Sequence, residues 1–289
     1  NIELPSNESL KLLAPQKSKD KILKPMSTIK NNIIHYSDMK KTIKSTPLFV
    51  PGGQSTQLIV GATPESDFKI INLSQNLYDK FNLKRVYYSA YVPVIQNNKF
   101  LPQISHPPMI REHRLYQADW LIRFYGFKAD ELLKNNNDNF DLNYDPKTQW
   151  ALNNLNYFPI DVNKASYEML LRIPGVGVTS AKKILKIRRV HKLTFDDLKK
   201  LRIVLKRSKY FITCSGKYYG QVAFDDVSIR MKIIEGNLPK KNSINPDQIS
   251  FFDSNSFDES SYETSKSGII IPKNILTLPE KLTSLNGEF

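Results

Sequence analysis

The sequence predicts an α/β domain over residues 1–155, an all-α domain over 156–220 and a disordered tail over 221–289. The run Thr56–Ala62 is continuously apolar and bounded by Pro and Gly residues, which is typical of a strand buried on both faces of a parallel sheet. Basic residues gather in the second region. The tail is rich in Ser, Asn, Asp and Lys, a composition that cannot offset the entropy lost on ordering.

The length and composition of the chain exclude several classes of protein. With 289 residues and 40% hydrophobic content, the chain can build one large domain and one small domain. Cys214 is the only cysteine, which excludes a disulfide framework or a zinc ribbon built from this chain alone. No apolar run reaches membrane-spanning length and no secretory leader opens the chain, so we expect a cytoplasmic protein without a membrane partner. Because Asn1 replaces an initiator methionine, we expect the C-terminal part of a longer protein.

The first residues, Asn1–Pro5, have the character of a strand end. Ser6 follows and is expected to cap a helix through Leu13, with Glu8 in the first turn. The polar stretch from there to Thr46 predicts a long loop or a weak helix.

A strand, a helix and a second strand come next. The strand Thr56–Ala62 precedes a stretch of helical periodicity over Glu65–Phe81, and Lys84–Val94 returns to strand character. This order predicts a right-handed βαβ unit in a parallel sheet. A further helix is expected over Pro108–Phe127, closed by Gly126, so the region has the pattern of half an α/β barrel. Residues 149–156 predict a short connecting helix.

The segment Asp161–Arg189 resembles the helix-hairpin-helix family. Asn163 is expected to cap a helix that ends at Leu170, Leu171 and Ile173, and Pro174-Gly175-Val176-Gly177 forms the hairpin. The two glycines permit backbone conformations closed to other residues and let amides approach a phosphate oxygen. A helix starting near Val178 adds its positive end to the same site. The expected DNA-binding residues here are Gly175, Val176, Gly177, Thr179, Ser180, Lys182 and Lys183.

Residues 192–212 have the pattern of a second, degenerate copy. Thr194 caps its first helix, and its hairpin, Arg202–Leu205, lacks both glycines. We expect it to complete a four-helix core and to contact phosphate through Lys206, Arg207 and Lys209. From Lys164 to Lys217 there are fifteen Lys or Arg against three acidic residues, a net +12 within a total of +14, as expected of a phosphate-binding surface.

Two alternatives use the same residues. The glycines could serve only the turn of an αα-hairpin, and the charges could form a solvated helix face. A DNA glycosylase would need a catalytic acid near Asp196 or Asp197, but these residues lie in the first turn of a helix, where acids complement its dipole. The position of the glycosylase lysine holds Thr179.

Residues 1 to about 220 resemble a family of radical SAM proteins assigned to DNA modification or repair, through PGGQSTQLIVGATPE, RVYYSAYVPV and REHRLYQADWLIRFYGF. The resemblance implies the later strands of a radical-SAM-type (β/α) barrel, with S-adenosylmethionine and a four-iron four-sulfur cluster in the intact protein. The CxxxCxxC triad that holds the cluster is absent from this chain, so no catalytic residue is assigned. Because ligands gather at strand carboxyl ends in such barrels, the expected cofactor contacts are Glu3, Gly61, Thr63 and Tyr91, together with Gln54 and Ser55 on a neighbouring loop.

The tail contains one peptide that stands out, Gln248-Ile249-Ser250-Phe251-Phe252. It is similar to the peptides by which bacterial repair and replication proteins dock onto the sliding clamp, with Gln248, Phe251 and Phe252 as anchors. The sequence leaves three hypotheses: part of a radical SAM enzyme acting on DNA, a non-catalytic DNA-binding protein, and an inactive truncated product.

Overall fold

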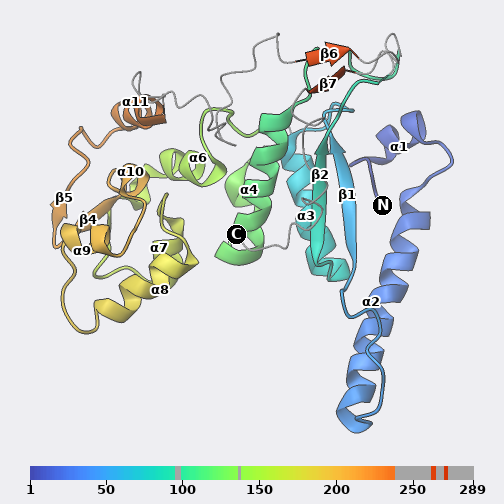
Figure 1. Cartoon of the computed structure of the whole chain (residues 1–289), viewed down its shortest axis with the longest axis horizontal. Helices are drawn as coiled ribbons and strands as arrows, with labels where there is room; N and C mark the ends of the chain where they lie inside the picture. Colours follow the sequence, from blue (N-terminus) through green and yellow to red (C-terminus); the bar gives the residue numbers. More distant parts are fainter. Residues whose placement is uncertain (95–98, 136–137, 238–261, 265–269, 273–289) are drawn as a thin grey trace. The chain divides into compact units, whose positions relative to one another are not determined.

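The computed structural model describes residues 1–94, 99–135, 138–237, 262–264 and 270–272 (Figure 1). Residues 1–93 and 99–237 lie in one compact unit. A second unit contains the antiparallel pair β6 (Tyr262–Thr264) and β7 (Ile270–Pro272).

Two helices open the chain. α1 (Asn7–Leu13) is capped by Ser6, whose hydroxyl accepts a hydrogen bond from the Ser9 amide at 3.0 Å, as the sequence predicts. α2 (Lys19–Thr42) is a helix of 24 residues where the sequence left a loop or a weak helix. It is mostly exposed, with Met26 buried, so it contributes little to the core.

The predicted βαβ unit is confirmed. β1 (Ser55–Val60) and β2 (Arg85–Ala90) pair in parallel, with α3 (Asp67–Phe81) between them in sequence. On the other side of β1, Glu3 forms a parallel bridge with Leu58. The Glu3 amide donates to the Gln57 carbonyl at 2.9 Å, and the Ile59 amide donates to the Glu3 carbonyl at 2.7 Å.

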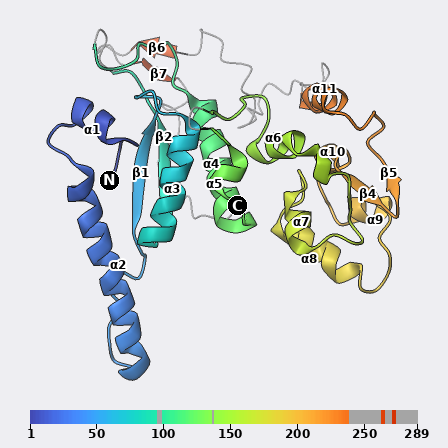
Figure 2. The same ribbon diagram turned by 180° about the vertical axis from the view of Figure 1, so that it is seen from behind.

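α4 (Met109–Tyr125) ends at Gly126, which adopts a φ of +70°, as predicted. α3 and α4 pack on the same sheet face, the one that buries Tyr88 (Figure 2). The Tyr88 hydroxyl donates to Ser74 of α3 at 2.8 Å and also lies against Asp119 of α4. The described residues thus form a small parallel sheet packed by helices, and they give no support for a radical SAM barrel.

Short helices lead into the second half of the unit: α5 (Ala129–Leu132), α6 (Pro146–Asn153) and the 3-10 turn Leu155–Tyr157. Asp145 caps α6, and Pro146 occupies its first position. The helix therefore begins three residues before the predicted connecting helix. One hydrophobic core runs through the unit, from Leu58 through Trp150 to Leu198.

The helical half contains four short helices and a small sheet. The helices are α7 (Tyr167–Arg172), α8 (Val178–Ile187), α9 (Phe195–Lys200) and α10 (Leu205–Ser208). The sheet, which the sequence did not predict, orders β3 (Ile160–Asp161), β4 (Ile212–Cys214) and β5 (Lys217–Tyr218). β3 runs parallel to β4, and β5 antiparallel to it.

The start of the tail differs from the predicted disorder. Asp226–Asn237 form helix α11, which buries Ile229 and Ile233 against the core. Val227, Ile229, Met231 and Ile233 alternate along the sequence, a pattern that does not indicate a helix. Only Ile229 and Ile233, one helical turn apart, are buried, and they suffice because a neighbouring core receives them. The docking peptide Gln248–Phe252 lies outside the described residues.

Candidate nucleic-acid interface

The first helix of the motif is capped one turn later than predicted. Ser166, and not Asn163, caps α7, with its hydroxyl accepting from the Met169 amide at 3.2 Å. The Asn163 side chain instead bonds both backbone groups of Leu193, accepting from its amide at 2.8 Å and donating to its carbonyl at 3.0 Å. Asn163 therefore ties the first half of the motif to the second.

The two hairpin glycines have different roles. Gly175 adopts a φ of +80°, a left-handed conformation that favours glycine. A Cβ on Gly175 would lie 2.6 Å from the Val204 carbonyl oxygen of the second hairpin. Gly177 has an extended backbone with φ −96°, so the sequence argument that it needs a special conformation was wrong. A Cβ there would lie 3.1 Å from the Tyr125 hydroxyl, which makes close approach its role.

The second hairpin repeats the first at a spacing of 27 residues, as the numbering shows. Arg202 adopts a φ of +58° at the position of Gly175. The other counterparts match in burial: Ile203 is buried like Val176, Ser208 like Ala181 and Leu198 like Leu171. The second hairpin therefore shares the left-handed position and the burial pattern of the first, although an arginine occupies its left-handed position.

Val176, in the turn of the first hairpin, makes its contacts within the chain. The Val176 amide donates to the Ile173 carbonyl at 3.1 Å, and the Val176 side chain is buried. The Val176 carbonyl accepts from the ammonium of Lys147 at 2.6 Å. Val176 thus serves the turn and the core in this structure, and both its amide and its carbonyl are engaged within the chain.

Lys147 is a buried residue of α6 that sequence reasoning missed. The pKa of its ammonium is lowered to about 7, chiefly by burial; the positive charge of Arg172 adds to the shift, and the carboxylate of Asp145 opposes it. The ammonium also lies 4.8 Å from the centroid of the Tyr125 ring. Nothing in the local sequence marks this lysine, because its partner is a carbonyl 29 residues away.

Tyr125 meets the hairpin from the last turn of α4. Burial raises the pKa of its hydroxyl, while the Trp120 side chain and the Val178 backbone, both N–H donors, favour the ionised form and oppose that rise. Because Val178 is the first residue of α8, the Tyr125 oxygen lies at the positive end of that helix. A neutral hydroxyl therefore occupies part of the region that an anion would favour.

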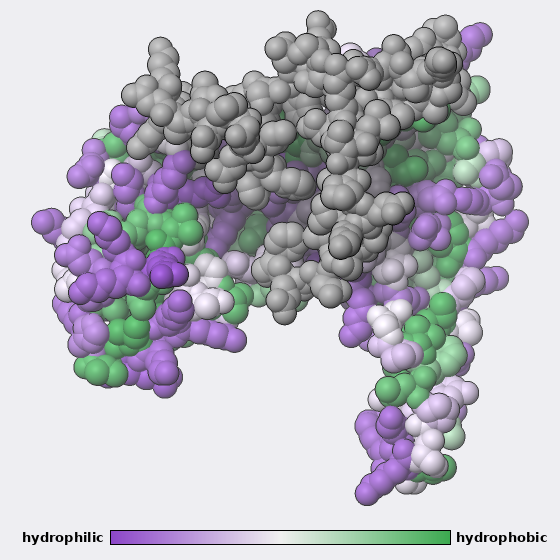
Figure 3. All heavy atoms as spheres, viewed as in Figure 1, coloured by the Kyte–Doolittle hydropathy of each residue, from purple (hydrophilic) through white to green (hydrophobic). Residues whose placement is uncertain are grey.

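The basic side chains differ in availability. Thr179, Lys182, Lys183 and Lys206 are exposed, and Ser180 is half-buried. Figure 3 shows mainly hydrophilic residues over α8 and α9, with apolar residues between them. Two predicted contacts are engaged within the chain. Arg207 pairs with Asp145 at 3.0 Å, and the ammonium of Lys209 lies 4.9 Å from the centroid of the Tyr210 ring.

The acids weighed for a glycosylase are structural or solvated. Asp197 forms a capping box with Thr194, in which the Thr194 amide donates to the Asp197 carboxylate at 2.9 Å. This bond lowers the pKa of Asp197, and the nearby His191 lowers it too. Asp196 is exposed on the same turn.

The predicted cofactor residues do not come together. Gln54 and Ser55 lie at the amino end of β1, and the Gln54 amide donates to the carbonyls of Met26 and Phe81 at 3.1 and 2.8 Å. Glu3, Gly61, Thr63 and Tyr91 lie toward the carboxyl end. There Glu3 pairs with Lys17 at 2.5 Å, and a Cβ on Gly61 would lie 2.7 Å from Pro108. Tyr91 packs against the apolar cluster of Leu4 and Leu10.

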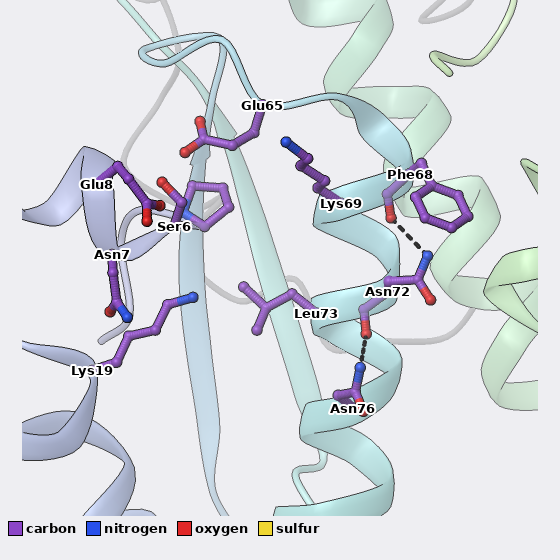
Figure 4. Close-up of a pocket in the computed structure, with 11 residues that line it drawn as sticks. Ser6, Asn7, Glu8, Lys19, Glu65, Phe68, Lys69, Asn72, Leu73 and Asn76 are labelled. Carbon is purple, nitrogen blue, oxygen red and sulfur yellow. Dashed lines mark hydrogen bonds between the residues drawn. The ribbon is translucent and has the colours of Figure 1, made fainter. Parts of the chain in front are cut away.

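A pocket of about 490 Å³ does lie near this end, between α1 and α3 (Figure 4). Its lining includes the buried carboxylate of Glu65, which points toward Ser6 and Glu8 (Figure 4). Burial raises the pKa of Glu65, but hydrogen bonds from Ser6, Ser9 and Thr63 outweigh it and lower the pKa overall. Of the predicted cofactor residues, Thr63 is thus linked to the pocket, because its side chain forms a hydrogen bond with Glu65 in the pocket lining.

The described residues do not fit an iron–sulfur cluster. Cys214, the only cysteine in the sequence, is buried in β4, where its thiol donates to the Leu193 carbonyl at 3.0 Å. Within the described ranges, no group of three or more His, Cys, Asp or Glu side chains could hold a metal ion.

Within those same ranges, no helix is both long and apolar enough to cross a membrane.

Comparison with protein families identifies a helix-hairpin-helix motif at residues 156–207. The match spans α7 to α10, and therefore both hairpins. The chain matches no curated protein and no solved structure. The helix-hairpin-helix motif is accordingly present, and it indicates binding to nucleic acid.

Proposed function

We propose that this protein binds DNA through its backbone phosphates, without regard to sequence, by means of the two hairpins. The observation that carries the proposal is the repeated hairpin of the helix-hairpin-helix motif, at a spacing of 27 residues, within a segment of net charge +12. Phosphate contacts position a protein on DNA but do not select bases, so little sequence preference is expected.

Two kinds of group would hold the phosphates. Backbone amides near Gly175, Gly177 and the first turn of α8 supply oriented donors, with Thr179 and Ser180 beside them. Exposed Lys182, Lys183 and Lys206 supply charge. Arg207 contributes when it exchanges the Asp145 carboxylate for a phosphate. Lys209 contributes its charge from its position beside the Tyr210 ring.

The test is the salt dependence of binding to a labelled blunt duplex, measured by fluorescence anisotropy. The logarithm of the affinity falls with the logarithm of salt concentration by about 0.9 per phosphate contact. Replacing Lys182 and Lys183 together by Gln should therefore reduce that slope by about 1.8. The matched control replaces two exposed lysines, Lys40 in the last turn of α2 and Lys44 just beyond the helix, by Gln. Equal slopes in both double variants would contradict the proposal.

A second candidate function is binding of a small ligand in the pocket beside Glu65. The favouring observation is that one carboxylate oxygen of the buried Glu65 has no hydrogen-bond partner among the described residues. The resemblance to radical SAM proteins of DNA modification or repair makes S-adenosylmethionine the ligand to try. Titration calorimetry with that compound, on the chain and on Glu65→Gln, tests it. No heat of binding to the unaltered chain would remove this candidate.

The sliding clamp remains a proposal from sequence alone. A peptide spanning residues 246–254, titrated against a purified clamp, should bind with micromolar affinity if Gln248, Phe251 and Phe252 are anchors. The same peptide with both phenylalanines changed to alanine is the control. Equal affinities would remove the clamp as a partner.

A further inference from the structure

Three large aromatic side chains are exposed on β2 and α4. Tyr87 is 44% exposed, Trp120 41% and Phe124 47%. Tyr116, Trp120 and Phe124 follow one another at intervals of four residues, so they share one face of α4. The rings of Trp120 and Phe124 lie 4.3 Å apart between centroids. We call Tyr87, Tyr116, Trp120 and Phe124 the aromatic row.

Guanidinium groups lie over this row at both ends. The Arg85 guanidinium lies 4.9 Å from the ring centroid of Tyr87 and 5.8 Å from that of Tyr116. The Arg123 guanidinium lies 4.8 Å from the centroid of Phe124 and 5.9 Å from that of Trp120. Aromatic rings and a guanidinium group therefore lie together at each end of the row.

The acids near the row are already engaged. The Glu112 carboxylate accepts from the Ala90 amide at 2.6 Å. The Asp119 carboxylate is buried and accepts from Arg123 at 2.9 Å and from the Tyr78 hydroxyl. Within the described residues, Arg85 forms no ion pair. The surface thus favours an anionic partner.

The exposure of the aromatic row is not explained by a strand missing from the edge of β2. The free edge of β2 is capped by side chains: the Val86 amide donates to the Tyr78 hydroxyl at 3.0 Å, and the Tyr88 amide to the Tyr116 hydroxyl at 3.0 Å. The Tyr116 hydroxyl in turn donates to the Tyr88 carbonyl at 2.9 Å. An edge whose backbone groups are satisfied in this way offers no template for another strand.

The row continues to the hairpin through Tyr125. The hydroxyl of Tyr125 lies 3.1 Å from where a Cβ on Gly177 of the hairpin would be, and it interacts with the Trp120 side chain and with the Val178 backbone at the start of α8. A polymer whose backbone is held at the hairpin would therefore reach Trp120 and Phe124 with its next units.

We propose that the aromatic row, with Arg85 and Arg123, stacks the unpaired bases of a single strand that continues from DNA held at the hairpins. Bases stack on aromatic side chains without sequence preference, and guanidinium groups follow the phosphates between them. The inference rests on the proposed binding of DNA backbone and extends it to junctions between duplex and single strand. It predicts a preference for a duplex with a single-stranded extension over the same duplex with blunt ends.

Fluorescence tests this directly, because the chain has two tryptophans and one of them, Trp150, is buried. In the full chain carrying Trp150→Phe, emission reports Trp120. We expect saturable quenching by an oligothymidylate of about 12 nucleotides, within the usual size of such sites. In the Trp150→Phe chain, Phe124→Ala should weaken this binding at least about fivefold, the loss expected for one stacked base.

Blunt and extended duplexes separate the two proposals. The variants Trp120→Ala and Phe124→Ala should bind the blunt duplex as the unaltered chain does, which also shows that they fold, and should lose the preference for the extended duplex. Equal binding of both duplexes by the unaltered chain would overturn the aromatic row while leaving backbone binding intact. Failure to bind the blunt duplex at all would instead overturn the proposed function. Self-association that Trp120→Ala abolishes, without quenching by oligothymidylate, would assign the row to a second copy of the chain and overturn the inference.

Discussion

At the scale of single residues, Gly175 and Gly177 flank one turn yet meet different surroundings. Gly175 combines a left-handed backbone with a backbone oxygen 2.6 Å from where a Cβ would lie. Gly177 has an extended backbone, and its nearest neighbour is the hydroxyl end of a side chain. The end of a side chain moves more easily than a carbonyl fixed in a neighbouring hairpin.

We therefore predict that Gly175→Ala destabilises the protein by more than about 1 kcal/mol, because it strains the backbone and displaces the second hairpin. Gly177→Ala should cost clearly less. Urea unfolding of both variants and the unaltered chain measures the difference. Equal losses, or a greater loss at Gly177, would contradict the geometry.

Lys147 provides a prediction about pH. Its pKa is lowered to about 7 in the fold from an ordinary value of 10.5, so the unfolded chain binds more protons between these values. Unfolding then takes up a proton, and the free energy of unfolding rises with pH across the window, by at most about 1.4 kcal/mol per pH unit. Below pH 7 the buried charge is present in full and gives its greatest destabilisation.

The variant Lys147→Met removes this titration. The free energy of unfolding of the unaltered chain, minus that of the variant, should increase from pH 7 to pH 10. Urea titrations at several pH values measure this difference, in which the other titrating groups largely cancel. A flat difference would show that the ammonium keeps an ordinary pKa, and a falling one would show that the fold raises it; either would contradict the prediction.

At the scale of elements, the second copy depends on the capping box that starts α9. Thr194 and Asp197 satisfy each other's backbone amides there. Thr194→Ala should cost about 1 kcal/mol of stability and raise the pKa of Asp197 toward its ordinary value. Urea unfolding and an NMR titration measure the two effects. Thr179→Ala, on an exposed position of α8, is the control and should change neither quantity.

At the scale of the whole molecule, α11 determines where a shortened chain can end. Ile229 and Ile233 are buried in the core, and each buried side chain of this kind contributes about 1.5–3 kcal/mol. A chain ending at Asn237 should therefore be more stable than one ending at Gly220, as thermal melts of the two would show. If the two chains melt at the same temperature, α11 contributes nothing and the boundary expected from sequence was adequate.

Local patterns in the sequence were sufficient to predict several of the helices and strands. The apolar run through Leu58, the periodicity of α3, the glycine that ends α4 and the caps at Ser6 and Thr194 all predicted structure that is present. Each of these signals acts within a few residues, so one sequence is enough to read it. The hairpin was recognised for the same reason, from Pro174 to Gly177.

Contacts distant in sequence were decided by the tertiary structure alone. Lys147 binds the hairpin, Tyr125 occupies the start of α8, Arg207 pairs with Asp145, and the predicted cofactor residues lie at opposite ends of β1. The sequence by itself determined that a basic helix-hairpin-helix motif follows a parallel βαβ unit. Which backbone amides and which charges remain free for a partner was decided by packing, because a side chain 29 or 62 residues away leaves no local pattern in the sequence.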